Sequence, residues 1–297
     1  MSMESLSKRI KTTEDLRNIV STMKSLSSVS ILQYEQAQKS LIEYTHTIRN
    51  AFHALIKTNA VFIPTHEKTS ATSKTIAIVI GSDNGLVGRF NKEIMQTAAL
   101  SLKEKGISPK DAVFITVGKR VAALAEQQQY DLFAKYAVSN SIKAINSIAS
   151  TVIVRMEEAM EKTKATRVLL FYHKRLPNQP TEIEQITLLP FALQQYKNLK
   201  NEPWPTNNVP LITLKPQVLV SKLIQEYLMI VLSGAITMSL AAEHHARMIN
   251  MQNAEKNIDE SLEQMNLEFQ QMRQEAITEE LIDVVSGSEA LQVKKRS

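Results

Sequence analysis

The most suggestive chemical motif is a glycine-bearing turn. The stretch GSDNGLVG at 81–88 follows an apolar run and precedes a predicted helix, which is a place where backbone N–H groups can hold a phosphate. Its glycines do not have the G-x-G-x-x-G spacing, and the chain contains no G-x-x-x-x-G-K-[ST] motif. We therefore interpret the stretch as a tight turn capped by Asp83, and we predict neither direct nucleotide binding nor a bound cofactor.

Histidines could hold a metal ion only if their spacing brought the rings together. The chain has six of them: His46, His53, His66, His173, His244 and His245. His46 and His53 are about 10 Å apart along a helix, too far to share one ion, and adjacent histidines point in different directions. No H-E-x-x-H motif occurs. We predict no metal site and interpret the histidines as surface or interface residues.

The residue pattern does not support nucleophilic or acid–base catalysis. The chain has no cysteine, no G-x-S-x-G motif and no recognisable Ser-His-Asp arrangement. The carboxylates Glu279 and Glu280 lie near the end of a predicted helix, where a solvated face or an ion pair with a partner is the better interpretation. We predict no catalytic residue, and an interaction or mechanical protein is favoured over an enzyme.

The composition predicts a largely helical protein. Only 7 of 297 residues are glycine, and strong helix formers are abundant. The net charge of +5 is not gathered into a basic stripe with aromatic residues, so we expect no nucleic-acid binding. The N-terminus opens into a charged helical pattern rather than a signal peptide. The apolar run at 227–242 is shorter than the ~20 residues of a membrane span and is interpreted as a buried helix.

Two long arms flank a middle region. Apolar residues recur at alternating steps of three and four in both arms, which is the seam of a helix that packs along another helix. The N-terminal seam comprises Leu16, Ile19, Met23, Leu26, Tyr34, Ala37, Leu41, Tyr44, Ile48, Ala51 and Leu55. The C-terminal seam comprises Met251, Ala254, Ile258, Leu262, Met265, Phe269, Met272 and Ala276. We predict helices over about 4–58 and 216–291, paired antiparallel.

The middle region alternates between strands and helices. The predicted strands are 75–81, 111–118, 166–172 and 182–190, and the predicted helices lie near 91–105, 119–129 and 141–163. This alternation indicates a three-layer α/β domain with parallel crossovers. A Pro/Asn-rich loop follows at 201–210.

Four stretches carry a resemblance to a known family. They are LSKRIKTTEDLRNIVSTMKSLSS (6–28), IGSDNGLVGRFN (80–91), SLAAEHHARMINMQNA (239–254) and MRQEAITEELIDVVSGSEAL (272–291). In order and spacing they resemble the gamma subunit of F-type ATP synthases, most specifically at the R-Q-x-x-I-T-x-E-L segment of the last stretch. Departures at Asn84, Val87 and Arg89 indicate a diverged branch.

The resemblance implies an α/β fold. The N- and C-terminal helices would form a long antiparallel coiled coil, and the middle of the chain would form a central Rossmann-like α/β domain without nucleotide. The corresponding segments are 1–60 for the N-terminal helix, 70–200 for the α/β domain, 201–215 for a foot loop and 216–297 for the C-terminal helix.

The resemblance also implies a function. The chain would be the non-catalytic rotor shaft that couples ion flow through a membrane ring to ATP synthesis or hydrolysis. The implied partners are the alpha and beta subunits of the catalytic ring, a small epsilon-type subunit and the membrane c-ring. The implied location is the cytoplasmic side of a bacterial inner membrane, as a peripheral protein.

Contact residues follow from the matched motifs. The residues implied at the catalytic-ring collar and catch loop are Arg273, Gln274, Thr278, Glu279, Met23 and Lys24. The residues implied at the foot, facing the membrane ring and the epsilon-type subunit, are Trp204, Lys215 and Lys222.

Two other functions remain open at this point. A coiled-coil scaffold or adaptor with an inserted α/β domain would explain the arms but not the R-Q-x-x-I-T cluster. A nucleotide-dependent enzyme would explain the sheet, but the phosphate-binding motif is missing.

Overall fold

The computed structural model describes residues 2–58, 74–139, 141–175, 181–191, 196, 198–199, 201–204, 208 and 211–296. The fold divides into two compact units. Unit 1 combines the chain up to Leu26 with the chain from Met248 onward, and unit 2 runs from Ser27 to Arg247.

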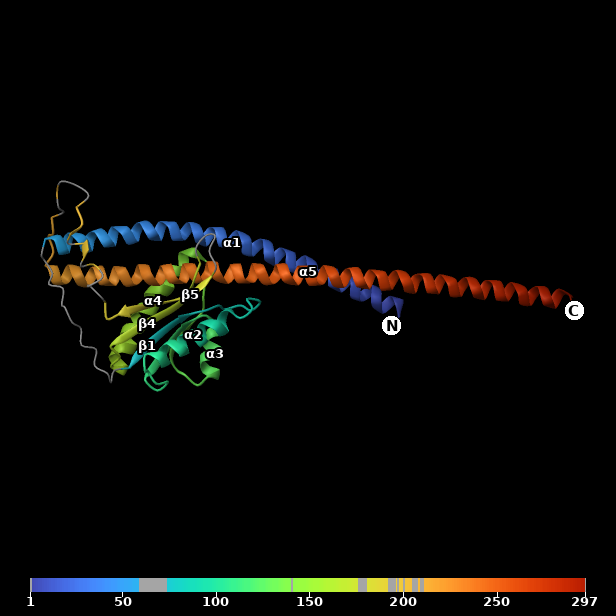
Figure 1. The fold of residues 1–297 in the computed structure, drawn as a ribbon, viewed down its shortest axis with the longest axis horizontal. Coiled ribbons are helices and arrows are strands. Elements are labelled where there is room, and N and C mark those ends of the chain that lie inside the picture. The colour runs from blue at the N-terminus through green and yellow to red at the C-terminus, as the bar shows by residue number, and fades with distance from the viewer. Residues whose placement is uncertain are drawn as a thin grey trace. The chain divides into compact units, whose positions relative to one another are not determined.

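Two long helices contribute to both units. Helix α1 spans Met3–Lys57 and helix α5 spans Pro216–Arg296 (Figure 1). No glycine or proline interrupts α1. Helix α5 begins at a proline, which is tolerated at the first helical position because its missing N–H would be unbonded there anyway. Both helices were predicted from the apolar period and the absence of helix-breaking residues.

Unit 2 contains a five-stranded sheet in the order β3-β2-β1-β4-β5. The strands are β1 (Thr75–Ile80), β2 (Ala112–Val117), β3 (Asp131–Tyr136), β4 (Arg167–Lys174) and β5 (Glu182–Leu189). The β1–β2, β1–β4 and β2–β3 pairs are parallel, and the β4–β5 pair is antiparallel. The sheet domain is therefore of the predicted α/β type.

Strand β3 was not predicted. It is an edge strand with no fully buried residue, and its sequence DLFAKY carries exposed charges at Asp131 and Lys135 rather than a continuous apolar run. An edge position tolerates such a mixed sequence because one side of the strand remains open. The apolar pattern alone therefore gave no strand signal.

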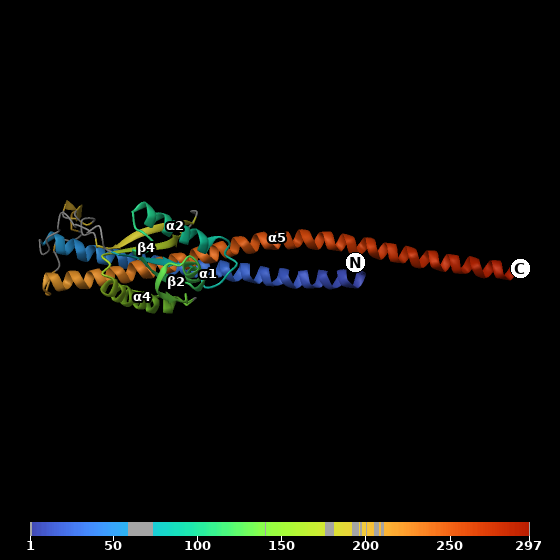
Figure 2. The same ribbon diagram turned by 90° about the horizontal axis from the view of Figure 1, so that it is seen from below.

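Helices cover both faces of the sheet. They are α2 (Phe90–Glu104), α3 (Lys119–Gln127) and α4 (Ile142–Thr163), and Figure 2 shows α2 and α4 on opposite sides of the strands. Alternate residues of β1 enter different cores, as the period of two requires. Ile76, Ile78 and Ile80 pack with residues of α4 and α5, whereas Ala77 and Val79 pack with residues of α2 and α3.

Helices α1 and α5 pair antiparallel in each unit, as predicted. In unit 1, Arg17 pairs with Asp259 and Lys24 pairs with Glu255. In unit 2, Tyr34 stacks on His244, and the hydroxyl of Tyr44 donates to Glu226 at 3.2 Å. In both units the residue number rises along α1 as it falls along α5, which defines the antiparallel direction.

The predicted phase of the N-terminal seam is wrong in unit 1. Leu16, Ile19 and Leu26 are 50%, 56% and 64% exposed, while Arg17 and Lys24, one residue beyond the predicted seam, face α5 through their ion pairs. A shift of one residue turns a helix face by about 100°. The charged side chains Glu255 and Asp259 on α5 set this phase, and an apolar stripe on α1 is left exposed.

The predicted C-terminal seam holds only in part. Met251 and Met265 are buried, and Leu262, Phe269 and Met272 are half-buried. From Arg273 to Val285 every side chain is exposed, including the predicted seam residue at 276. This part of α5 therefore has no apolar cover within its own unit.

One helical segment of the described chain is long and apolar enough to cross a membrane. An 18-residue window within 216–285 has a mean hydropathy of 1.5. More than half of that window is buried, and Leu232, Ile236 and Leu240 of α5 belong to the core beneath the sheet. A core helix has these same properties, which agrees with the interpretation from the sequence.

Candidate functional site

The turn after β1 is closed by packing. A Cβ added to Gly81 would lie 2.6 Å from Oδ1 of Asn91 and 2.7 Å from Cβ of Val121. The N–H of Ser82 donates to the same Asn91 oxygen at 2.9 Å, and the Asn91 amide donates to the Ser82 hydroxyl at 2.8 Å. Neither space nor the Ser82 N–H is left for a phosphate, so this turn lacks the cradle that a Rossmann-type nucleotide site needs.

Asp83 has a different role from the one predicted. Its Oδ1 accepts hydrogen bonds from the N–H of Lys119 at 2.9 Å and from the N–H of Val138 at 3.1 Å. It therefore caps the start of α3 and holds the segment after β3, rather than capping its own turn. The correction arises because the carboxyl ends of parallel strands meet at one edge of the sheet, a proximity that is not visible along the chain.

His173 fills the same edge of the sheet. Its ring stacks on Phe90 with centroids 3.7 Å apart, and its Nε2 lies 3.1 Å from the Phe90 carbonyl oxygen. Because a carbonyl only accepts, Nε2 carries the proton. His173 and His53 are 3% and 2% exposed, so the prediction of surface or interface histidines is wrong for these two. His66 lies outside the described residues.

Stability should depend on pH through His173. Burial lowers the pKa of His173 from 6.5 to about 4, against the opposing effect of the Phe90 carbonyl. The contribution of the neutral His173 ring to the free energy of unfolding is therefore complete above pH 6.5 and is lost as the pH falls towards 4. We expect this effect to lower the unfolding free energy of the wild type by up to about 3 kcal/mol between pH 7 and pH 4. The His173→Gln variant should lack this part of the decrease. Urea unfolding between pH 7 and pH 4 measures both proteins.

The exposed His46 provides the control for this experiment. His46→Gln is the same substitution at an exposed position, so it should change the unfolding free energy at pH 7 by less than about 0.5 kcal/mol. Parallel profiles for the wild type and His173→Gln would contradict the assignment.

A buried charge pair lies on α5. Arg247 Nη2 donates to Oε1 of Glu243 at 2.5 Å, and the two side chains are 8% and 4% exposed. Arg247 Nη1 also lies 3.4 Å from Nδ1 of His244. Burial raises the pKa of Glu243, and the hydrogen bond and charge of Arg247 oppose that rise. The sequence signal, a glutamate four residues before an arginine at the end of an uncharged run, was not recognised as a site.

The predicted collar residues on α5 lie on an exposed helical surface. Arg273, Gln274, Thr278 and Glu279 are all exposed. The Thr278 hydroxyl donates to the Gln274 carbonyl at 2.8 Å. Gln274, Thr278 and Glu279 line one shallow hollow together with Gln271, Glu275 and Ile282. Arg273 forms no ion pair with any residue that the structure describes, so its guanidinium is available to a partner.

The predicted collar residues on α1 are not brought to Arg273. Met23 and Lys24 are half-buried, and Lys24 pairs with Glu255. Glu255 precedes Arg273 by 18 residues on α5, which is roughly 27 Å along the helix. The structure thus holds two separate patches in unit 1 rather than one cluster.

The predicted foot residues occupy unit 2. The Trp204 ring meets His53 edge-on with centroids 5.0 Å apart, and its Nε1 donates to the Asn208 carbonyl at 3.0 Å. Nearby, both carboxylate oxygens of Glu202 accept from Nη2 of Arg49, at 2.7 and 2.8 Å. These contacts hold the described part of the loop against the end of α1.

The two foot lysines are solvated. Lys215 and Lys222 are exposed on either side of the first turns of α5. Leu211 and Leu214, which precede Lys215 in the chain, are 88% and 48% exposed. Lys222 instead precedes the buried Leu223, so the two foot lysines have different surroundings.

The fold defines a class of protein: paired antiparallel terminal helices combined in one chain with a Rossmann-like α/β domain whose first βα turn is closed by packing. A family model described as ATP synthase matches residues 2–291, and the chain belongs to this ATP synthase family. Two of its curated relatives are named ATP synthase gamma chain.

Two curated relatives illustrate the match. The ATP synthase gamma chain of Bdellovibrio bacteriovorus is 27% identical over 297 residues, covering 98% of this chain and 99% of the relative. The ATP synthase gamma chain of Persephonella marina is 25% identical over 299 residues, with the same coverage of both chains.

Solved structures share the fold. The rotor of the Euglena gracilis mitochondrial ATP synthase matches with a TM-score of 0.63 at 15% identity, covering 93% of this chain and 98% of that chain. The central stalk and c-ring structure of the Tetrahymena thermophila enzyme contains a chain that matches with a TM-score of 0.56 at 18% identity, covering 80% and 99%. These matches confirm the predicted combination of coiled coil and α/β domain.

Proposed function

We propose that this chain is the rotating central shaft of an F-type ATP synthase. It couples ion flow through a membrane ring to ATP synthesis or hydrolysis in the alpha/beta catalytic ring. The observation that carries the proposal is the end of α5, where every described side chain from Arg273 to Val285 is exposed. Exposed apolar residues in this stretch, including Ile277, Leu281 and Val284, need cover from another protein.

Segment roles follow from this proposal. Residues 1–60 and 216–297 form the shaft, 70–200 form the α/β domain, and 201–215 form the foot loop. The complex lies at the cytoplasmic side of a bacterial inner membrane, with this chain as a peripheral subunit.

The partners follow from the two kinds of surface. The collar residues Arg273, Gln274, Thr278 and Glu279 contact the alpha/beta ring, and Met23 and Lys24 add a second contact along α1. The foot residues Trp204, Lys215 and Lys222 face the c-ring and an epsilon-type subunit. The structures that share this fold come from assemblies described as rotor, OSCP/F1/c-ring and central stalk/c-ring, which supports this partner set.

The shaft acts on the catalytic ring by contacting its subunits unequally. A shaft that contacts one catalytic subunit more favourably than its neighbours stabilises the conformation of that subunit. Only such a difference in contact free energy can shift the populations around the ring. Arg273 offers a planar guanidinium that can form a forked, charge-assisted hydrogen bond with a carboxylate of the ring.

Arg273→Ala should impair coupling more than folding. We expect ion-driven ATP synthesis by the purified complex to fall about tenfold, because a charge-assisted hydrogen bond contributes roughly 1.5–3 kcal/mol. The unfolding free energy of the isolated chain should change by less than about 0.5 kcal/mol, since Arg273 is exposed. ATP synthesis is measured in vesicles and stability by urea unfolding.

Two further variants separate charge from geometry. Arg273→Lys keeps the charge without the fork and should give an intermediate rate, while Lys256→Ala, another exposed cation on α5, should retain wild-type synthesis. Normal ATP synthesis by the Arg273→Ala complex would contradict the proposed contact. A scaffold unrelated to ATP synthesis would instead be indicated if the chain did not co-purify with threefold excesses of alpha and beta subunits.

A further inference from the structure

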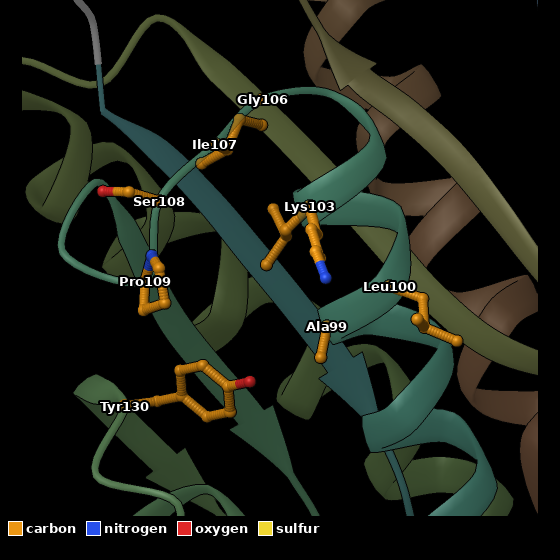
Figure 3. Close-up of a pocket in the computed structure, with 9 residues that line it drawn as sticks. Ala99, Leu100, Lys103, Gly106, Ile107, Ser108, Pro109 and Tyr130 are labelled. Atoms are coloured by element: carbon orange, nitrogen blue, oxygen red, sulfur yellow. The ribbon is translucent and has the colours of Figure 1, made fainter.

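The α/β domain has a pocket at the edge of the sheet opposite the closed turn. It lies between the end of α2, the loop that leads into β2, and Tyr130 directly before β3 (Figure 3). Its volume is about 530 Å³, which is within the range of small-molecule sites. The lining is mainly apolar: Ala99, Leu100, Leu102, Ile107, Pro109 and Tyr130.

Two polar groups remain open at this pocket. Figure 3 shows the Lys103 ammonium and the Tyr130 hydroxyl facing the space between α2 and the Tyr130 ring. Lys103 is exposed and has no ion-pair partner among the described residues. The Tyr130 ring is held against Phe114 with centroids 4.5 Å apart. The Ser108 hydroxyl, in contrast, already donates to the Asp111 carboxylate at 2.6 Å.

We propose that this pocket binds a small amphipathic carboxylate, with an apolar body of about ten carbons and its anionic head at Lys103. The apolar wall removes the body of the ligand from water. The Lys103 ammonium pairs with the carboxylate, and the Tyr130 hydroxyl donates a hydrogen bond to it. A ligand with a cationic head is disfavoured, because Lys103 is the only charged residue among those that line the pocket in the described chain, while Glu104 and Asp111 balance Lys105 and Lys110 in the neighbouring sequence.

The carboxyl end of α2 does not oppose this assignment strongly. Open carbonyl groups at a helix end repel an anion. Here the N–H of Gly106 donates to the Lys103 carbonyl at 3.0 Å, and the N–H of Ile107 donates to the Leu102 carbonyl at 2.9 Å. Gly106 adopts a φ of +69°, which permits this helix ending. The carbonyl groups of Leu102 and Lys103 therefore accept hydrogen bonds from within the chain and repel an anionic ligand less.

The test is calorimetric titration of the full chain with decanoate below its micelle concentration. We expect saturable binding by the wild type and about fivefold weaker binding by Lys103→Met, which keeps the aliphatic stem but removes the charge. Ala99→Leu, which fills the pocket, should abolish binding. Decyltrimethylammonium, which has the same chain and a cationic head, should not bind.

Lys105→Met is the matched control, because Lys105 follows Lys103 by two residues but does not line the pocket. Equal weakening by Lys103→Met and Lys105→Met would overturn the proposal, as would undiminished binding by a folded Ala99→Leu variant. Failure of decanoate to bind the full chain, together with protection of Lys103 from acylation in the assembled complex, would assign the pocket to a protein segment and also overturn it.

Discussion

Arg247→Ala should lower the free energy of unfolding by about 3–5 kcal/mol. The substitution leaves the Glu243 carboxylate buried, at 4% side-chain exposure, without the guanidinium that donates to it at 2.5 Å. A buried charge that loses its partner is far more costly than the intact pair was favourable. Urea unfolding of the full chain at pH 8 measures the loss.

The pH dependence identifies the cause of this loss. Without Arg247, burial raises the pKa of Glu243 further above its unfolded value of 4.5. A group whose pKa is higher in the folded state makes its full contribution to stability below the pKa of the unfolded state. This contribution is lost as the pH rises through the pKa of the folded state. The destabilisation should therefore be smaller at pH 5 than at pH 8. Equal losses at both pH values would contradict the buried-charge explanation.

A matched pair on the same helix provides the control. Lys256 and Glu260 have the same four-residue spacing as the buried pair, but they are 77% and 62% exposed. Lys256→Ala should cost less than about 0.5 kcal/mol, since an exposed pair is solvated and screened. A comparable cost for Lys256→Ala and Arg247→Ala would show that burial does not decide the effect.

Gly118→Ala should destabilise the α/β domain by at least about 3 kcal/mol. Gly118 has a φ of +123°, which residues with a side chain rarely adopt. An added Cβ would lie 2.7 Å from the carbonyl carbon of Gly81 and 2.9 Å from the nitrogen of Ser82. Both obstacles are backbone atoms at the closed edge of the sheet, so relief requires the turn itself to move. Urea unfolding of the full chain measures the cost.

Gly106→Ala separates conformational strain from steric overlap. Gly106 also has a positive φ, of +69°, but nothing lies within 4 Å of an added Cβ. We expect a cost of only about 1 kcal/mol from the left-handed backbone. Should both alanine variants lose the same stability, the close approach of Gly118 to Gly81 would not be the cause.

The position of Gly118 also explains why this Rossmann-like edge holds no phosphate cradle. Gly118 allows the end of β2 to approach the backbone of Gly81 and Ser82, and Gly81 allows the side chains of Asn91 and Val121 to pack against the turn. In nucleotide-binding relatives of the fold, glycines at such a turn leave room for a pyrophosphate. Here the glycines make room for other parts of the same chain, and Oδ1 of Asn91 accepts the hydrogen bond from the N–H of Ser82.

Much of the secondary structure could be predicted from local sequence. Uninterrupted helix formers predict α1 and α5, and continuous apolar runs predict β1, β2 and β4, because buried strands and long helices have strong periods of their own. The cluster from Arg273 to Glu279 is predicted from its motif, and the structure shows that its side chains are exposed. Whether it contacts a catalytic ring remains a prediction.

Tertiary structure alone decided the other features. The ion pairs of Arg17 and Lys24 set the phase of the seam, against an apolar pattern that favoured Leu16 and Ile19. The partners of Asp83 lie 36 and 55 residues further along the chain. These features depend on which surfaces meet in space, and local sequence periods do not carry that information.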